Sequence, residues 1–79
     1  SREAEAQKEA IIKTRLEAYI VEKARQANAS VTADITLGQE GLPQAVTVTG
    51  ALSPAARGRL KRILTQELGI PEVRQQWNG

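Results

Sequence analysis

Residues 31–49, VTADITLGQEGLPQAVTVT, decide the fold because they contain two stretches in which apolar and polar side chains alternate. The apolar positions are Val31, Ala33, Ile35, Leu37, Val46 and Val48. Successive side chains of a β-strand point to opposite faces, so this alternation is typical of strands with one buried face. The connector at residues 38–44 contains two glycines and a proline, which favour turns. We therefore expect an antiparallel hairpin.

The stretch before the hairpin, residues 3–27, predicts a long helix. It contains no Gly or Pro and is rich in strong helix formers. One stripe at helical spacing is expected to face the core: Ile12, Leu16, Tyr19, Ile20, Ala24 and Ala27. Glu9 and Lys13 are four residues apart, which predicts an ion pair on the helix surface.

This helix is predicted to be longer than the domain that it serves. At 1.5 Å per residue it spans about 36 Å, whereas a compact chain of this size has a radius of gyration of about 12 Å. The apolar stripe starts only at Ile12. We therefore expect residues 1–11 to project as a helical stalk cut from a longer chain, and residues 12–79 to form a single α+β domain.

The stretch after the hairpin predicts a second helix and a third strand. Ser53 and Pro54 form a strong helix start, with Ser as the N-cap and Pro at the first helical position. Gly69 is placed to end the helix. A short strand is expected at residues 72–77. The order α-β-β-α-β predicts an α+β fold in which two helices pack on one face of a three-stranded sheet.

Composition argues against catalysis. The 79 residues include no His and no Cys, and no metal-binding, phosphate-binding or nucleotide-binding motif occurs. A nucleophile beside a base, a carboxylate pair or a metal site is therefore not expected. We predict that the chain is not an enzyme and has no catalytic, metal-binding or cofactor-binding residues. The net charge of +2, from 11 basic and 9 acidic residues, is too small to imply a nucleic-acid partner by itself.

Two surfaces are candidates for binding. On the first helix an outer ridge lies opposite the core stripe and comprises Ile11, Thr14, Ala18 and Val21. It is either a protein interface or a set of scattered apolar residues of the kind normal on helices, and the sequence favours neither. On the second helix a basic face comprises Arg57, Arg59, Lys61 and Arg62. It could bind phosphate or lipid headgroups, but the solvated side of an amphipathic helix is the favoured interpretation.

Four stretches resemble a known family. They are LEAYIVEKA at residues 16–24, VTADITL at 31–37, VTVTG at 46–50 followed by Ser53 and Arg57, and LGIPE at 68–72 followed by Gln76 and Trp77. Their order and spacing are similar to those of the C-terminal soluble domain of the stage III sporulation protein AF family. The strand and helix order also resembles the ring-building motif of double-membrane secretion machines.

The resemblance implies a function and a location. It implies a non-enzymatic assembly domain of the sporulation channel that links mother cell and forespore. The partners would be further copies or other subunits, with the domain on the mother-cell side or in the intermembrane space. The full-length chain would be membrane-anchored through segments upstream, and this fragment would itself be soluble. The alternative is a small soluble nucleic-acid-binding module that uses the basic face, although we do not expect a nucleic-acid partner.

Overall fold

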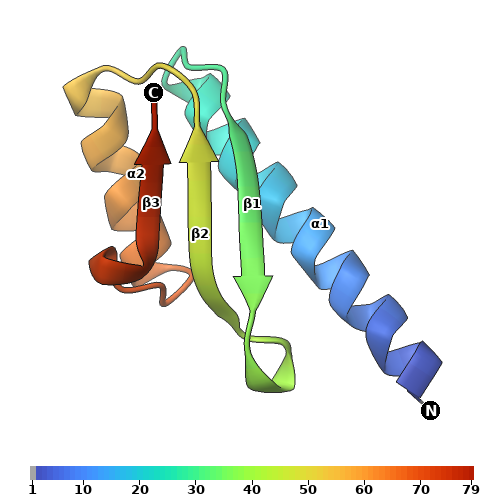
Figure 1. The fold of residues 1–79 in the computed structure, drawn as a ribbon. Helices are drawn as coiled ribbons and strands as arrows, with labels where there is room; N and C mark the ends of the chain where they lie inside the picture. The colour runs from blue at the N-terminus through green and yellow to red at the C-terminus, as the bar shows by residue number, and fades with distance from the viewer. Residues whose placement is uncertain (1) are drawn as a thin grey trace.

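A computed structural model describes residues 2–79; Ser1, the first residue of the predicted stalk, lies outside the described residues. The elements follow in the order α1 (Arg2–Gln26), β1 (Thr32–Leu37), β2 (Pro43–Thr49), α2 (Pro54–Gln66) and β3 (Gln75–Asn78). Two 3-10 turns, η1 (Gln39–Gly41) and η2 (Glu72–Arg74), lie in the connections. Both helices lie behind the sheet in Figure 1, and its other face is uncovered. The predicted α+β fold is confirmed.

The sheet is mixed and has the order β1-β2-β3. β1 and β2 are antiparallel, with Ile35 opposite Val46. β2 and β3 are parallel, with Val46 opposite Gln75. A parallel neighbour needs a crossover connection, and α2 provides it. β2 therefore lies in the centre of the sheet, between its hairpin partner β1 and the parallel strand β3.

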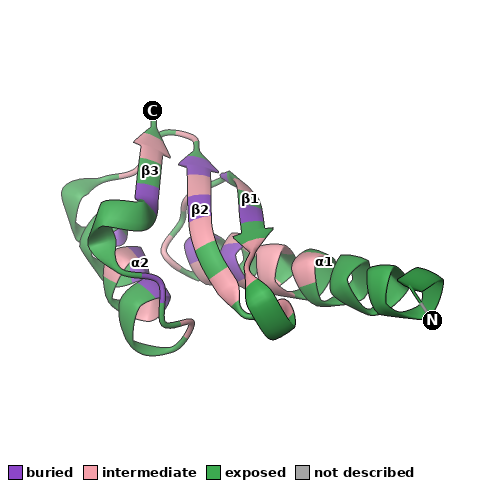
Figure 2. Ribbon diagram, turned by 60° about the horizontal axis from the view of Figure 1, so that its bottom comes forward, coloured by how far each residue is buried: buried purple, intermediate pink, exposed green. Residues whose placement is uncertain are grey.

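The core lies between the sheet and the two helices (Figure 2). Its buried side chains are Ile20, Ala24, Val31, Ile35, Val46, Val48, Leu60, Leu64 and Ile70. Of the apolar positions in the two alternating stretches, Val31, Ile35, Val46 and Val48 are buried, as the sequence predicts, whereas Ala33 and Leu37 are half-buried. Leu64 is fully buried in this cluster. Truncating such a leucine to alanine costs about 2–5 kcal/mol, because the lost transfer free energy adds to that of a cavity.

Local signals set the helix ends. The Ser53 hydroxyl accepts a hydrogen bond from the Ala56 N–H at 3.1 Å, so the predicted N-cap of α2 is confirmed. Asn28 takes a left-handed conformation with φ of 60° after α1. The Ala29 N–H then donates back to the Ala24 carbonyl, satisfying one of the carbonyls that a helix end leaves free. Gly69, with φ of 71°, turns the chain after α2.

Two sequence-based boundaries are wrong. β3 begins at Gln75 instead of residue 72, because the Arg74 N–H donates to the Pro71 carbonyl and closes η2. Val73, which falls within the predicted strand, lies in η2 instead and is 92% exposed. β2 begins at Pro43, inside the predicted connector, and a register irregularity follows Thr36.

Gln75 is a buried polar residue that ties β3 to the end of α2. Its Nε2 donates to the Thr65 hydroxyl at 3.0 Å and to the Ile70 carbonyl at 2.9 Å. Its Oε1 is buried and has no hydrogen-bond partner among residues 2–79. The two donated bonds hold the α2–β3 connection against the sheet.

The first turns of α1 lie beyond the rest of the molecule. Residues 2–10 are all exposed, and this part of the helix extends past the sheet (Figures 1 and 2). The molecule measures 43 × 21 × 19 Å. Ile12, expected in the core stripe, is 38% exposed because it lies where α1 leaves the sheet.

Candidate functional site

The outer ridge of α1 is an unpartnered helix face. Ile11 is 52% exposed, Thr14 and Ala18 are exposed, and Val21 is half-buried. The opposite side of α1 places Ile20 and Ala24 in the core. The helix has therefore already used its inner side to hold the domain together. The structure places the four ridge residues along one stripe, because they recur at intervals of three and four residues.

Charged side chains flank the ridge on one side. Lys8, Arg15 and Glu22 are exposed and follow one another at intervals of seven residues. Glu22 also accepts a hydrogen bond from Arg25 at 3.3 Å within the same helix. This pair is exposed, so it contributes little to stability. The flank therefore offers both signs of charge to a neighbouring helix.

A polar latch fixes α1 against the edge of β1. The Lys13 ammonium donates at 2.6 Å to the Glu17 carboxylate, the Asp34 carboxylate and the Ile35 carbonyl. The Glu17 carboxylate in turn accepts from the Ile35 N–H at 2.8 Å. Both backbone groups of Ile35 at this edge are thus hydrogen-bonded to α1 side chains. An unpaired strand edge is a template for aggregation. The latch occupies the backbone groups of this edge at Ile35.

The latch also changes the titration of Lys13. The hydrogen bonds to Asp34 and Glu17 raise the pKa of Lys13 above its ordinary value of 10.5, and partial burial only partly offsets them. The predicted Glu9–Lys13 pair is wrong, because all three donors of the ammonium are engaged with the other groups. Sequence reasoning missed the latch, since Asp34 and Ile35 come from a different element.

A second polar contact joins the two helices. The Tyr19 hydroxyl donates to Glu67, which follows the last turn of α2. This hydrogen bond, and to a lesser extent burial and the negative charge, raise the pKa of Tyr19 above 10.0. The Lys23 ammonium lies 5.3 Å from the centre of the Tyr19 ring. Together with the latch, this contact holds α1 in a fixed orientation on the domain.

The basic face of α2 is not a single patch. Arg57 stacks over Trp77, with its guanidinium 5.2 Å from the ring centre. Arg57 and Lys61 are four residues apart and Arg59 and Arg62 are three apart, so the cations form two pairs on different sides of α2. The structure therefore spreads the four cations around the helix instead of converging them on one point.

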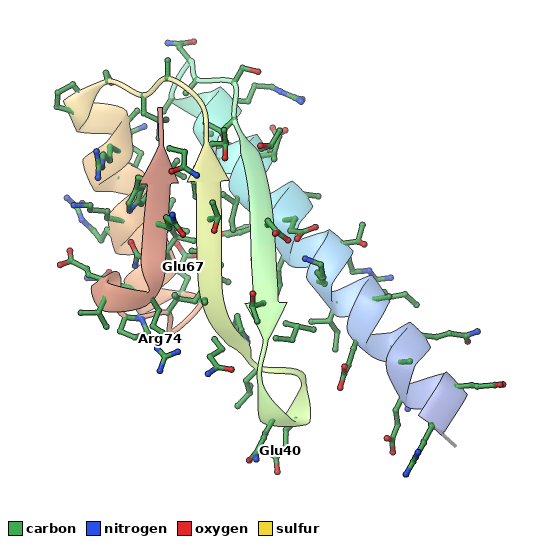
Figure 3. The ribbon with its side chains drawn as sticks, in the orientation of Figure 1. Glu40, Glu67 and Arg74 are labelled. Carbon is green, nitrogen blue, oxygen red and sulfur yellow. The ribbon has the colours of Figure 1, made fainter. Side chains whose placement is uncertain are left out.

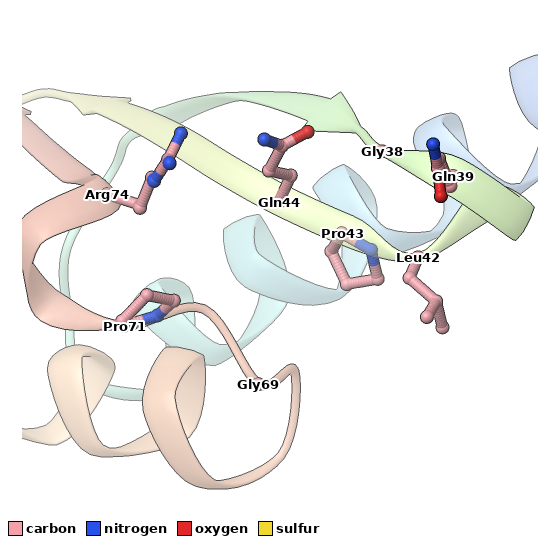
Figure 4. Close-up of a pocket in the computed structure, with 8 residues that line it drawn as sticks. All are labelled: Gly38, Gln39, Leu42, Pro43, Gln44, Gly69, Pro71 and Arg74. Carbon is pink, nitrogen blue, oxygen red and sulfur yellow. The ribbon is translucent and has the colours of Figure 1, made fainter.

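One groove was not anticipated from the sequence. It has a volume of about 600 Å³ and lies between η1, the start of β2 and η2 (Figure 4). β3 begins opposite Val46, so the first residues of β2 pair with β1 on one side and have no strand beside them on the other. Leu42, 63% exposed, and Arg74 line this groove. Arg74 and Glu40 lie at the same end of the sheet, whereas Glu67 comes from the end of α2 (Figure 3).

Within residues 2–79 no group of three or more His, Cys, Asp or Glu side chains could hold a metal ion. None of the helices in the described part of the chain is long and apolar enough to cross a membrane. The outer ridge of α1 remains the candidate site, because Ile11, Thr14 and Ala18 are exposed on it.

Comparisons with protein-family models, curated proteins and solved structures found no match for this chain. The function is therefore inferred from the residues and their arrangement.

Proposed function

We propose that this chain is a non-catalytic assembly domain that binds other protein subunits through the outer ridge of α1. The observation that carries the proposal is the exposure of Ile11 and its ridge neighbours on a helix whose inner side already packs in the core. Burial of apolar surface is the main driving force of association. A rigidly held helix also loses little conformational entropy on binding.

The proposed setting is a sporulation membrane channel between mother cell and forespore. It is supported by the resemblance of residues 16–24, 31–37, 46–50 and 68–72 to the stage III sporulation protein AF family. The projecting turns of α1 would then connect the domain to membrane segments upstream. Fractionation of the full-length protein from sporulating cells tests this setting. Retention in membranes washed with high salt and alkali is expected, and recovery in the soluble fraction would overturn it.

The ridge itself is tested by paired substitutions. Ile11→Glu together with Ala18→Glu adds two charges to exposed positions and should leave thermal unfolding unchanged within a few degrees. Sedimentation equilibrium at increasing concentration should show that association is lost. Val73→Glu is the matched control, because Val73 is an exposed apolar residue outside α1. If the ridge variant associates as strongly as the control, subunits do not bind through this surface.

A second candidate is nucleic-acid binding by α2. The observation in its favour is that Pro54–Gln66 carries four cations and no carboxylate. Their spread around the helix and the stacking of Arg57 on Trp77 weigh against it. Binding would have to fall steeply with salt concentration. No binding of single- or double-stranded oligonucleotides at low salt would remove this candidate.

A further inference from the structure

The groove between η1, the start of β2 and η2 lies in line with β3. β3 pairs with β2 from Val46 onward, so residues 43–45 of β2 have a strand on the β1 side only. The groove occupies the other side and has a volume of about 600 Å³. The chain itself closes this position at one end, because Arg74 lines the groove and directly precedes the first residue of β3. An extended segment lying beside the start of β2 would therefore have to end, or turn away, at Arg74.

The closed end of the groove carries an unpaired positive charge. Among residues 2–79, Arg74 is the one charged residue in the lining, and none of the salt bridges includes it. The carboxylates of the two adjoining turns, Glu40 in η1 and Glu72 in η2, are exposed and do not line the groove. A guanidinium binds a carboxylate through charge-assisted hydrogen bonds that are frequently bidentate. This end of the groove therefore favours a carboxylate and disfavours an ammonium group.

The rest of the groove suits a short extended peptide. Leu42, 63% exposed, and two prolines give it apolar surface. Figure 4 shows Arg74 and Gln44 pointing to the same side, above these prolines. The Gln44 amide can both donate to and accept from a peptide backbone. From Leu42 to Val46 the chain spans about 13 Å at about 3.3 Å per residue, which leaves room for about three or four extended residues.

We propose that this groove binds the C-terminal segment of a partner protein, extended beside the start of β2 with its terminal carboxylate on Arg74. The segment would run parallel to β2 and in line with β3. The opposite direction would place an N-terminal ammonium beside Arg74, which is a like-charge contact. Pro43 has no N–H to donate, so binding depends mainly on the carboxylate and the apolar surface. The groove is separate from the outer ridge of α1, and its binding does not depend on assembly through that ridge.

Peptide pools test the proposal on the chain of residues 1–79. The probes are N-acetylated tetrapeptides of varied sequence without Asp or Glu, made as the free C-terminal acid and as the C-terminal amide. A third pool is amidated and has Glu at its last position, so its carboxylate belongs to a side chain. Each pool is titrated to millimolar concentration into the isotope-labelled protein, and backbone amide signals are followed by NMR.

The expected result is a shift of the Gly38, Gly69 and Arg74 signals with the free-acid pool, at several-fold lower concentration than with either amidated pool. Equal binding of the plain amide pool would overturn the proposal, because the carboxylate would then contribute nothing. Equal binding of the pool with Glu would overturn the assignment to a chain terminus. No shift at these three residues with the free-acid pool would overturn binding in the groove.

Substitutions locate the carboxylate. Arg74→Gln should weaken binding of the free-acid pool several-fold, and Leu42→Ser should weaken it as well. Arg59→Gln is the matched control, because it removes an exposed cation of α2 that does not line the groove. Thermal unfolding should be unchanged in Arg74→Gln, since the bond from its backbone N–H to the Pro71 carbonyl remains. Equal losses in Arg74→Gln and Arg59→Gln would show a general effect of charge and would overturn the proposal.

Discussion

Replacing Glu17 tests the latch between α1 and β1. Glu17→Ala removes the carboxylate that accepts the Ile35 N–H at 2.8 Å and that pairs with Lys13. The N–H belongs to a residue that is 1% exposed while Glu17 is in place. Glu17→Gln is the matched control, because an amide oxygen can still accept from the N–H but carries no charge.

The expected magnitude follows from the unpaired N–H. A buried donor left without a partner costs about 1–3 kcal/mol. A domain of this size loses about 4–8 °C in melting temperature for each kcal/mol. With about 2 kcal/mol as a central value, Glu17→Ala should lower the melting temperature by about 8–16 °C. Glu17→Gln should lower it by less than half as much.

Thermal unfolding followed by far-UV circular dichroism and by fluorescence of the single Trp measures both variants. Amide hydrogen exchange at Ile35 provides a local readout, since its protection should fall in the Ala variant and persist in the Gln variant. Equal losses in the two variants would show that the ionic contact, and not the backbone bond, stabilises the latch. An unchanged melting temperature in Glu17→Ala would refute the reasoning.

Three further predictions concern titration, capping and backbone conformation. Absorbance titration of Tyr19, the single tyrosine, should give a midpoint above 10.0, and Glu67→Gln should lower it. Because folding also raises the pKa of Lys13, the stability from both groups is complete below about pH 10 and is lost as the pH rises through their folded-state values. Ser53→Ala should cost about 0.5–2 kcal/mol in chemical denaturation, and Ser53→Gly only a few tenths. Gly50→Ala should cost about 1–3 kcal/mol from its φ of 144° alone, and more because the new Cβ would lie 2.7 Å from a backbone carbonyl; an unchanged denaturation midpoint would contradict this.

The elements themselves could be predicted because their signals are local. Alternation gave the inward positions of β1 and β2, and the Ser53-Pro54 pair gave the start of α2. The start of β3 could not be predicted in the same way. Val73 has the spacing of a strand residue, but the bond from the Arg74 N–H to the Pro71 carbonyl closes a turn at this point. The spacing of apolar residues carries no information about such a hydrogen bond.

The candidate site also has a part that could be predicted from the sequence and a part that could not. Helical spacing alone identified the outer ridge as a stripe, although only the structure shows that Ile11 is left uncovered. The latch required knowledge of which strand edge α1 follows. Glu9 and Glu17 are equally distant from Lys13 in sequence, and the position of Asp34 on β1 decides between them. Tertiary contacts, and not helix propensity, determine that choice.

The occupied backbone groups at the edge of β1 affect how an assembly of this domain would come apart. Assemblies that grow by strand addition share backbone hydrogen bonds and come apart slowly, often only when their subunits open. With both Ile35 backbone groups occupied by Lys13 and Glu17, this domain cannot exchange backbone bonds with a neighbour at that position. If subunits bind through the outer ridge as proposed, their contacts would use side chains alone, and subunits could join and leave while fully folded. Such a complex would be dismantled, and its subunits reused, without an unfolding machine.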